Sequence, residues 1–393
     1  MSDMARELAV KIAQVGLKQR SFPSIHDIEA FSHFFTSDGK LDIPSLDHRE
    51  GGCTRRELLL RFLVLSAVLD QGPDIVGVRA LVRQVTNHLY RREVRFLHQP
   101  LQFFRELGIA IDNILEEHSS VKAARAAIWA QENQSNAQKY NLFIDNSRQV
   151  LNYAVFRWGV PLALPLLLER DEKNEDRKPT VLTAHLKSWA SAEKMSQQLK
   201  DNERYGLGKA VGDKACHLYA KWCVSALPLL AEDKPNWGPL SYEQPFDSNA
   251  GRVLWRTGFL LRFAEEKDYV NQQVIKEGQG KSGLHYIRVT NIRGMKCAAP
   301  LTAELEDAYA TICLHHLCTN SRVPKKIQIQ RLPNAYLLAY GKGMSIADFD
   351  DGLIHIGTRF CFNHEAPKCP ECPVRRLCAG ANGEKCLITD YRT

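Results

Sequence analysis

The chain has 393 residues, of which 44% are hydrophobic and 25% are charged, and its formal net charge at pH 7 is +7. This composition is that of a globular chain with room for two domains, and no apolar run approaches the roughly 20 residues that a membrane-spanning helix needs. Residues 251–393 contain 20 Lys and Arg against 14 Asp and Glu. Such a basic excess suits a nucleic-acid-binding protein and is equally compatible with a merely soluble basic surface.

The first twenty residues predict a polar amphipathic helix. They lack the apolar centre and the small-residue cleavage site of a signal peptide. We therefore expect a cytoplasmic protein, associated with the nucleoid if the source is bacterial, whose eleven cysteines stay reduced.

The rest of the chain predicts a mainly α-helical fold. Helical periodicity covers residues 54–69, continues after a break at 70–74 to about residue 90, and recurs over 99–134, 139–156 and 183–203. A charged loop is expected at 169–179. The best strand-like segments are residues 285–290 and 326–331.

A glycine-rich turn is predicted between two helices. One helix ends near Tyr205, glycines follow at 206, 208 and 212, and a new helix begins at about Asp213. The unpaired N–H groups at the start of that helix suit a phosphate. A plain helical hairpin accounts for the same pattern.

Asp247 lies at the expected N-cap of a helix that includes residues 251–261. Capping alone is sufficient to explain an aspartate at this position.

Four cysteines near the C-terminus predict a metal centre. Cys361, Cys369, Cys372 and Cys378 form a C-x7-C-x2-C-x5-C pattern within eighteen residues. Zinc sites usually have two C-x2-C pairs separated by a long loop, whereas a compact loop with a single pair can surround a [4Fe–4S] cluster. A structural zinc site and disulfides are the alternatives.

The three motifs together, in this order, resemble the helix–hairpin–helix DNA glycosylases of the endonuclease III type. The family's hairpin, roughly L-P-G-V-G-x-K-T-A, matches G-K-A-V-G-D-K-A-C at residues 208–216. Its V-D-T-H-x-x-R-V segment matches F-D-S-N-A-G-R-V at 246–253, and its cysteine loop is one residue shorter than the loop here.

The resemblance implies two helical domains with a DNA-binding cleft between them and a C-terminal iron–sulfur loop. The expected segments are an N-terminal extension (1–54), a central helical domain (55–183), a hairpin and catalytic segment (184–265), an insertion (266–345) and a cluster domain that packs with the N-terminal helices (346–393).

The resemblance also implies the activity and the site residues. We expect a monomeric enzyme that flips a damaged or modified base, expected to be a pyrimidine, out of double-stranded DNA and excises it. In the family pattern Lys214 is the catalytic lysine, which would add AP lyase activity, and Asp247 is the catalytic aspartate. The expected DNA contacts are Gln71 as a wedge in the helix stack, Gly208, Lys209 and Gly212 in the hairpin, Arg252, and the loop residues Arg375 and Arg376.

Two other functions remain open. The chain could be a non-catalytic DNA-binding or scaffolding protein that keeps a glycosylase-like fold, or a zinc-stabilised nucleic-acid binder. In the insertion, Cys313 and Cys318 are expected in the core of an amphipathic helix rather than in a second metal site.

Overall fold

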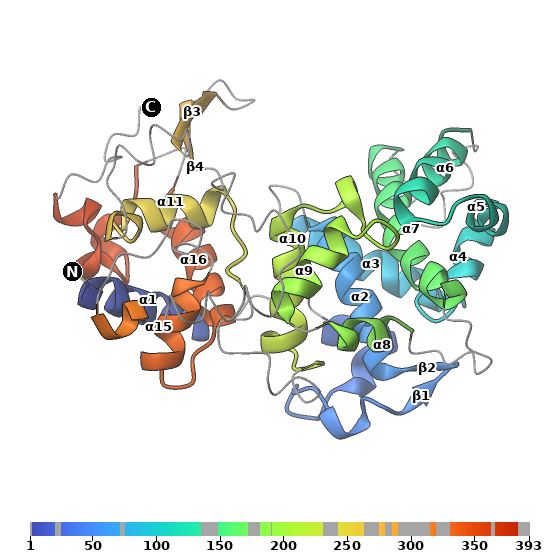
Figure 1. The fold of residues 1–393 in the computed structure, drawn as a ribbon, viewed down its shortest axis with the longest axis horizontal. Coiled ribbons are helices and arrows are strands. Elements are labelled where there is room, and N and C mark those ends of the chain that lie inside the picture. The colour runs from blue at the N-terminus through green and yellow to red at the C-terminus, as the bar shows by residue number, and fades with distance from the viewer. Residues whose placement is uncertain are drawn as a thin grey trace. The chain divides into compact units, whose positions relative to one another are not determined.

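The computed structural model describes residues 2–19, 25–70, 75–134, 148–171, 181–189, 191–230, 243–262, 275–279, 285–289, 315–319, 331–362 and 366–383. The fold is mainly helical, as the sequence predicts (Figure 1). The chain forms two compact units, which are described separately. Unit 1 comprises residues 1–21, 191–193 and 235–393, and unit 2 comprises residues 22–190 and 194–234. This division assigns residues 22–54 to unit 2 and the expected insertion at 266–345 to unit 1.

The described residues of unit 2 are mainly helical. The helices are α2 (Arg55–Leu69), α3 (Ile75–Arg91), α4 (Pro100–Glu106), α5 (Ile111–Glu117), α6 (Val121–Gln134), α7 (Arg148–Asp171), α8 (Val181–Ser188), α9 (Ala192–Asp201, which begins in unit 1) and α10 (Asp213–Lys221). A two-stranded ribbon, β1 (Arg49–Glu50) with β2 (Cys53–Thr54), precedes α2.

Helix α2 is the core of unit 2. Every residue from position 56 to position 69 is buried, and α3, α7, α8 and α10 pack against the helix. The Thr54 side chain caps its start by accepting a hydrogen bond from the Glu57 backbone N–H at 3.1 Å. The buried Glu57 pairs with Arg61 at 2.8 Å and accepts two backbone N–H groups at the start of α8, so its charge is fully compensated.

The predicted helices of unit 2 are confirmed where the structure describes them. Residues 99–134 form three short helices rather than one, and residues 183–203 form two. The helix predicted at 139–156 is described from Arg148 and continues to Asp171, so it overlaps the start of the expected charged loop. Residues 135–147 and 172–180 lie outside the described part.

Unit 1 is built from the two ends of the chain. Helix α1 (Ser2–Leu17) packs against α15 (Leu332–Tyr340) and α16 (Ile346–Arg359), and α11 (Ser248–Arg256) packs against α16. Their apolar side chains form one core, which includes Ile12, Trp255 and Phe349. An antiparallel pair of strands, β3 (Ile275–Gln279) and β4 (His285–Val289), contacts α11.

Two glycines allow close approach of α1 and α16. A Cβ atom added at Gly16 would lie 1.8 Å from the Asp348 carbonyl oxygen, and one at Gly352 would lie 2.0 Å from the Ile12 carbonyl oxygen. The two helix backbones are therefore in direct contact, and any larger residue would separate them.

The strand predicted at residues 285–290 is confirmed as β4, and its partner β3 was not predicted. Of the strand predicted at 326–331, only Arg331 is described, and it is the N-cap of α15. The expectation that Cys318 is buried in a core was wrong, because its thiol is exposed at the end of the helical residues 315–319. Cys313 lies outside the described residues.

In the part of the chain that the structure describes, none of the helices combines the length and the apolar character needed to cross a membrane.

Candidate functional site

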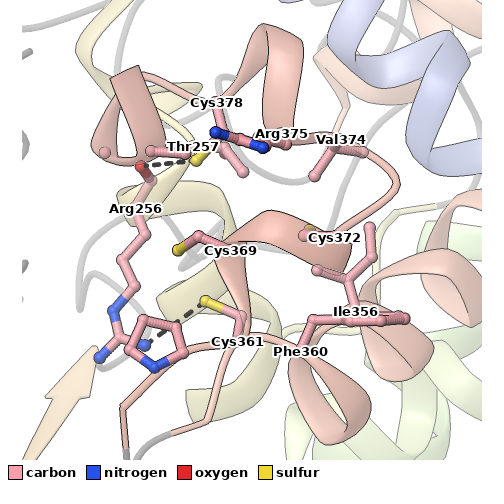
Figure 2. Close-up of a pocket in the computed structure, with 13 residues that line it drawn as sticks. Arg256, Thr257, Ile356, Phe360, Cys361, Cys369, Cys372, Val374, Arg375 and Cys378 are labelled. Carbon is pink, nitrogen blue, oxygen red and sulfur yellow. Dashed lines mark hydrogen bonds between the residues drawn. The ribbon is translucent and has the colours of Figure 1, made fainter. Parts of the chain in front are cut away.

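The four cysteines line a single cavity in unit 1 (Figure 2). Its volume is about 140 Å³, and its other walls include Ile356, Phe360 and Val374. Cys361 follows the end of α16, and the other three cysteines come from the next seventeen residues of the chain. The sequence motif therefore corresponds to one local site.

Short turns bring the cysteines to this cavity. The Cys361 N–H donates to the Ile356 carbonyl at 2.8 Å and ends α16, and the Lys368 N–H donates to the Phe360 carbonyl at 2.8 Å and closes the loop. The C-x2-C pair lies on a 3₁₀ turn, η8 (Cys369–Glu371), and Cys378 follows a second turn, η9 (Arg375–Leu377).

Burial favours the neutral form of three thiols in this cavity. Burial raises the pKa of Cys372 to about 12 and raises the pKa values of Cys369 and Cys378. Thiolates are the form that binds metals, so a bound cationic group must supply the energy that removes these protons.

The four thiols surround the cavity instead of meeting at one point. No group of three or more His, Cys, Asp or Glu side chains in the described ranges is arranged to hold a metal ion. A tetrahedral zinc site needs four sulfurs at about 2.3 Å from a common centre.

Two buried arginines of α11 hold the Cys361 end of the cavity. Arg252 donates to the carbonyls of Cys361 at 2.8 Å and Gly357 at 3.0 Å. Arg256 donates from Nη1 to the Cys361 sulfur at 3.4 Å, and its carbonyl accepts from the Cys378 thiol at 3.5 Å (Figure 2). Burial lowers the pKa of both guanidinium groups, and a Cys361 thiolate opposes this shift.

Asp247 is connected to the same site. Its carboxylate caps α11 by accepting the backbone N–H groups of Asn249 at 2.9 Å and Ala250 at 2.8 Å, which confirms the predicted N-cap. The Asn249 side chain accepts a short hydrogen bond from Arg252, and Arg252 contacts Cys361. Asn249 and Arg252 therefore link the half-buried Asp247 to the backbone carbonyl of Cys361, a candidate metal ligand.

The glycine turn lies in unit 2, between α9 and α10. Gly208 has a φ of +58° and begins a short 3₁₀ turn, η5 (Gly208–Ala210), and Gly212 is the N-cap of α10. Lys214 is the second residue of α10 and is half-buried. Lys214 belongs to unit 2 and Asp247 to unit 1, so each is described within its own unit.

The structure describes only some of the remaining residues that are predicted to contact DNA. Arg375 and Arg376 are exposed on η9, and Arg375 also lines the cysteine cavity. Gln71 lies outside the described residues, as does the side chain of Lys209.

Sequence reasoning missed two basic residues. Arg256 lies one helical turn after Arg252 on α11, and this i, i+4 spacing was a usable signal. Lys122 at the start of α6 is remote in sequence from the glycine turn, yet its Cγ would lie 3.3 Å from a Cβ atom added at Gly208. The Val121 N–H also donates to the Arg204 carbonyl at 2.9 Å, which fixes α6 beside this turn.

Comparison with protein-family models, with curated proteins and with solved structures finds no match.

Proposed function

We propose that this protein is a DNA glycosylase that excises a damaged or modified base after flipping its nucleotide out of the duplex. The observation that carries the proposal is the link from Asp247 through Asn249 and Arg252 to the backbone carbonyl of Cys361. It connects the carboxylate that the family resemblance assigns to catalysis with the cavity lined by four cysteines.

We propose further that the four cysteines hold a [4Fe–4S] cluster. Four cysteines around one cavity of about 140 Å³ suit a cubane of four irons and four sulfides. A cavity of about 150 Å³ accommodates a molecule as large as benzene. When bound, the cluster would supply a rigid metal–thiolate framework for residues 361–378 and need not transfer electrons.

The proposed chemistry uses two side chains. Cleavage of the N-glycosidic bond builds positive charge on the sugar, and the Asp247 carboxylate stabilises that charge. The neutral amine of Lys214 attacks the anomeric carbon as the bond to the base breaks, and the base leaves with the bonding electrons and takes up a proton. Loss of a proton from the attached nitrogen and opening of the sugar ring at the C1′–O4′ bond, whose oxygen takes up a proton, then give a Schiff base, which allows strand cleavage by β-elimination.

An excision assay across duplexes with different modified bases tests the glycosylase activity. The native protein should release one class of base, and Asp247→Asn should reduce the rate by about 100-fold or more. Release of no base from any duplex would contradict the proposal.

Borohydride trapping tests the lyase step separately, because reduction of a Schiff base gives a stable protein–DNA adduct. The native protein should form this adduct and Lys214→Ala should not. Lys40→Ala, which removes an exposed lysine from the same unit, is the control. An undiminished adduct with Lys214→Ala would exclude Lys214 as the nucleophile.

The absorption spectrum of the purified protein distinguishes the two metals. A [4Fe–4S] protein is brown and absorbs broadly in the blue, whereas a zinc protein is colourless. Iron analysis should give about four irons per chain for a full cluster.

We propose that α9, the glycine turn and α10 form a helix–hairpin–helix motif that binds the DNA backbone, with Lys122 as an added phosphate contact. Each phosphate contact removed should lower the slope of log K against log salt by about one. Lys122→Ala should show this change, and Arg375→Ala with Arg376→Ala should show about twice this change. Lys40→Ala, with the same loss of charge on an exposed loop, should leave the slope unchanged.

A non-catalytic DNA-binding protein is the second candidate. The observation in its favour is that capping of α11 already gives Asp247 two hydrogen bonds and a structural role. Salt-dependent DNA binding without excision of any base would support it.

A further inference from the structure

A small cavity in unit 2 is lined by three residues that each have a buried polar atom with no hydrogen-bond partner within the described residues. The atoms are the Ser66 hydroxyl oxygen, the Asp70 Oδ1 atom and the Trp222 indole nitrogen. Ser66 and Asp70 lie near the end of α2, and Trp222 begins a π-helical turn, η6 (Trp222–Ala226), that follows α10. The remaining walls are mainly the apolar side chains of Ile28 and Phe62 together with α3.

All three side chains are deeply buried, with exposed fractions of 5% for Ser66, 3% for Asp70 and 0% for Trp222. The other Asp70 carboxylate oxygen lies 3.6 Å from Arg79 Nη2 in an ion pair. A buried polar atom without a partner forfeits the hydrogen bonds that it makes to water in the unfolded chain, so most buried polar atoms in native proteins have a partner. Three such atoms on residues around one cavity favour a site for a small hydrogen-bonding molecule.

The size of the cavity limits that molecule to one of the smallest ligands. Its volume is about 10 Å³. A cavity of roughly 10–15 Å³ holds one water molecule, and a buried water typically makes about three hydrogen bonds.

The chemistry of the three atoms also distinguishes water from a cation. The indole N–H can only donate, so its partner must offer a lone pair. The Asp70 carboxylate can only accept, so its partner must offer a proton, and the Ser66 hydroxyl does either. A metal ion or an ammonium ion offers no lone pair to the indole, whereas one water molecule satisfies all three groups.

We propose that this cavity is a binding site for a single structural water, which accepts from Trp222 and donates to Asp70 and Ser66. The water joins the end of α2 to the π-helical turn and completes the surroundings of the Asp70–Arg79 pair. The water site is independent of the proposed glycosylase activity.

Magnetic resonance of the native, full-length protein labelled with ¹⁵N-tryptophan tests the site directly. The six tryptophans give six indole signals, and loss of one signal in Trp222→Phe assigns that of Trp222. We expect a cross-peak between the Trp222 indole proton and a long-lived water, with the same intensity in sodium, potassium and ammonium buffers. The absence of this cross-peak, or its dependence on the cation, would overturn the proposal.

Hydrogen exchange of the α2 amides gives a second test. Ser66→Ala and Trp222→Phe should each accelerate exchange by about tenfold. The acceleration of exchange in the double variant should be well below the product of the two single accelerations, because both substitutions disrupt the same water.

Tyr219→Phe provides the matched control for this coupling. Tyr219 is on α10 and donates directly to the Leu60 carbonyl at 3.3 Å. The accelerations of exchange caused by Tyr219→Phe and by Ser66→Ala should therefore multiply in the double variant. If the effects of Ser66→Ala and Trp222→Phe multiplied as fully as those of Ser66→Ala and Tyr219→Phe, a shared water would be contradicted. If a variant does not fold, the cross-peak of the native protein decides the question.

Discussion

At the scale of single residues, Asp247 combines two roles that substitution can separate. Asn is about as good an N-cap as Asp, so Asp247→Asn keeps the start of α11 and removes only the charge. Asp247→Ala removes both. We expect the free energy of unfolding to fall by about 0.5 kcal/mol or less for Asn and by about 1 kcal/mol for Ala, as measured by urea denaturation.

The excision rate should follow the charge and not the cap. Both variants should lose about the same activity despite their different stabilities. If activity followed stability instead, with Asp247→Asn near the native rate, Asp247 would be only a structural cap.

His98 makes the stability of unit 2 depend on pH. Burial, together with the neighbouring Arg95 and Arg61, lowers the pKa of His98 from its ordinary value of 6.5 to about 4. Its ring lies 3.1 Å from the Tyr90 hydroxyl. Between about pH 6.5 and pH 4 the unfolded chain therefore binds a proton that the folded protein does not, and stability falls as the pH falls.

We expect this one histidine to lower the free energy of unfolding of unit 2 by about 2 kcal/mol over that range. Urea denaturation at successive pH values measures this change. His98→Asn removes the titrating group and should flatten the dependence. An equally steep dependence in this variant would assign the effect to other groups, of which His185 is one because burial lowers its pKa too.

At the scale of elements, the packing of α1 against α16 depends on Gly352. A Cβ atom there would lie 2.0 Å from the Ile12 carbonyl oxygen, which is backbone and cannot rotate away. Gly352→Ala should therefore push the helices apart and lower the stability of unit 1 by about 1–3 kcal/mol. Hydrogen exchange of the α16 amides measures this effect. Thr358→Ala, on the exposed surface of α16, should leave exchange within about twofold of native.

The helices were predictable because their signals are local. Apolar periodicity located α2, and a capping residue followed by an Arg-containing segment located α11. The four cysteines were found by their spacing, which reflects the short loop that carries them.

Features that depend on tertiary contacts were not predictable in this way. The proximity of Lys122 to Gly208 results from packing between segments about 85 residues apart, and no local pattern records it. The exposure of Cys318 also depends on tertiary packing. The amphipathic pattern around it predicted burial, but its thiol is exposed. Strand β3 contains a glycine and alternates poorly, so its pairing with β4 gave little signal.

At the scale of the whole molecule, the two units differ in how much apolar packing their segments have. In unit 2 a fully buried helix organises the core. In unit 1 the described residues 366–383 contain only short 3₁₀ turns, and Val374 and Ala379 are their only buried apolar side chains. With so little buried apolar surface of its own, this segment would gain much of its order from the proposed cluster.

Loss of the cluster should therefore disorder one part of the chain and spare the rest. Cys372→Ala removes a ligand and should abolish the brown colour and the bound iron. It should also accelerate amide exchange over residues 366–383 by more than about tenfold, because metal binding supplies the folding energy of such segments. Exchange of the α2 amides in unit 2 should stay unchanged. Cys318→Ala, which removes an exposed thiol that does not line the cavity, should keep both the iron and the protection. Unchanged protection of residues 366–383 in an iron-free Cys372→Ala protein would show that this segment is held by its own packing and not by the cluster.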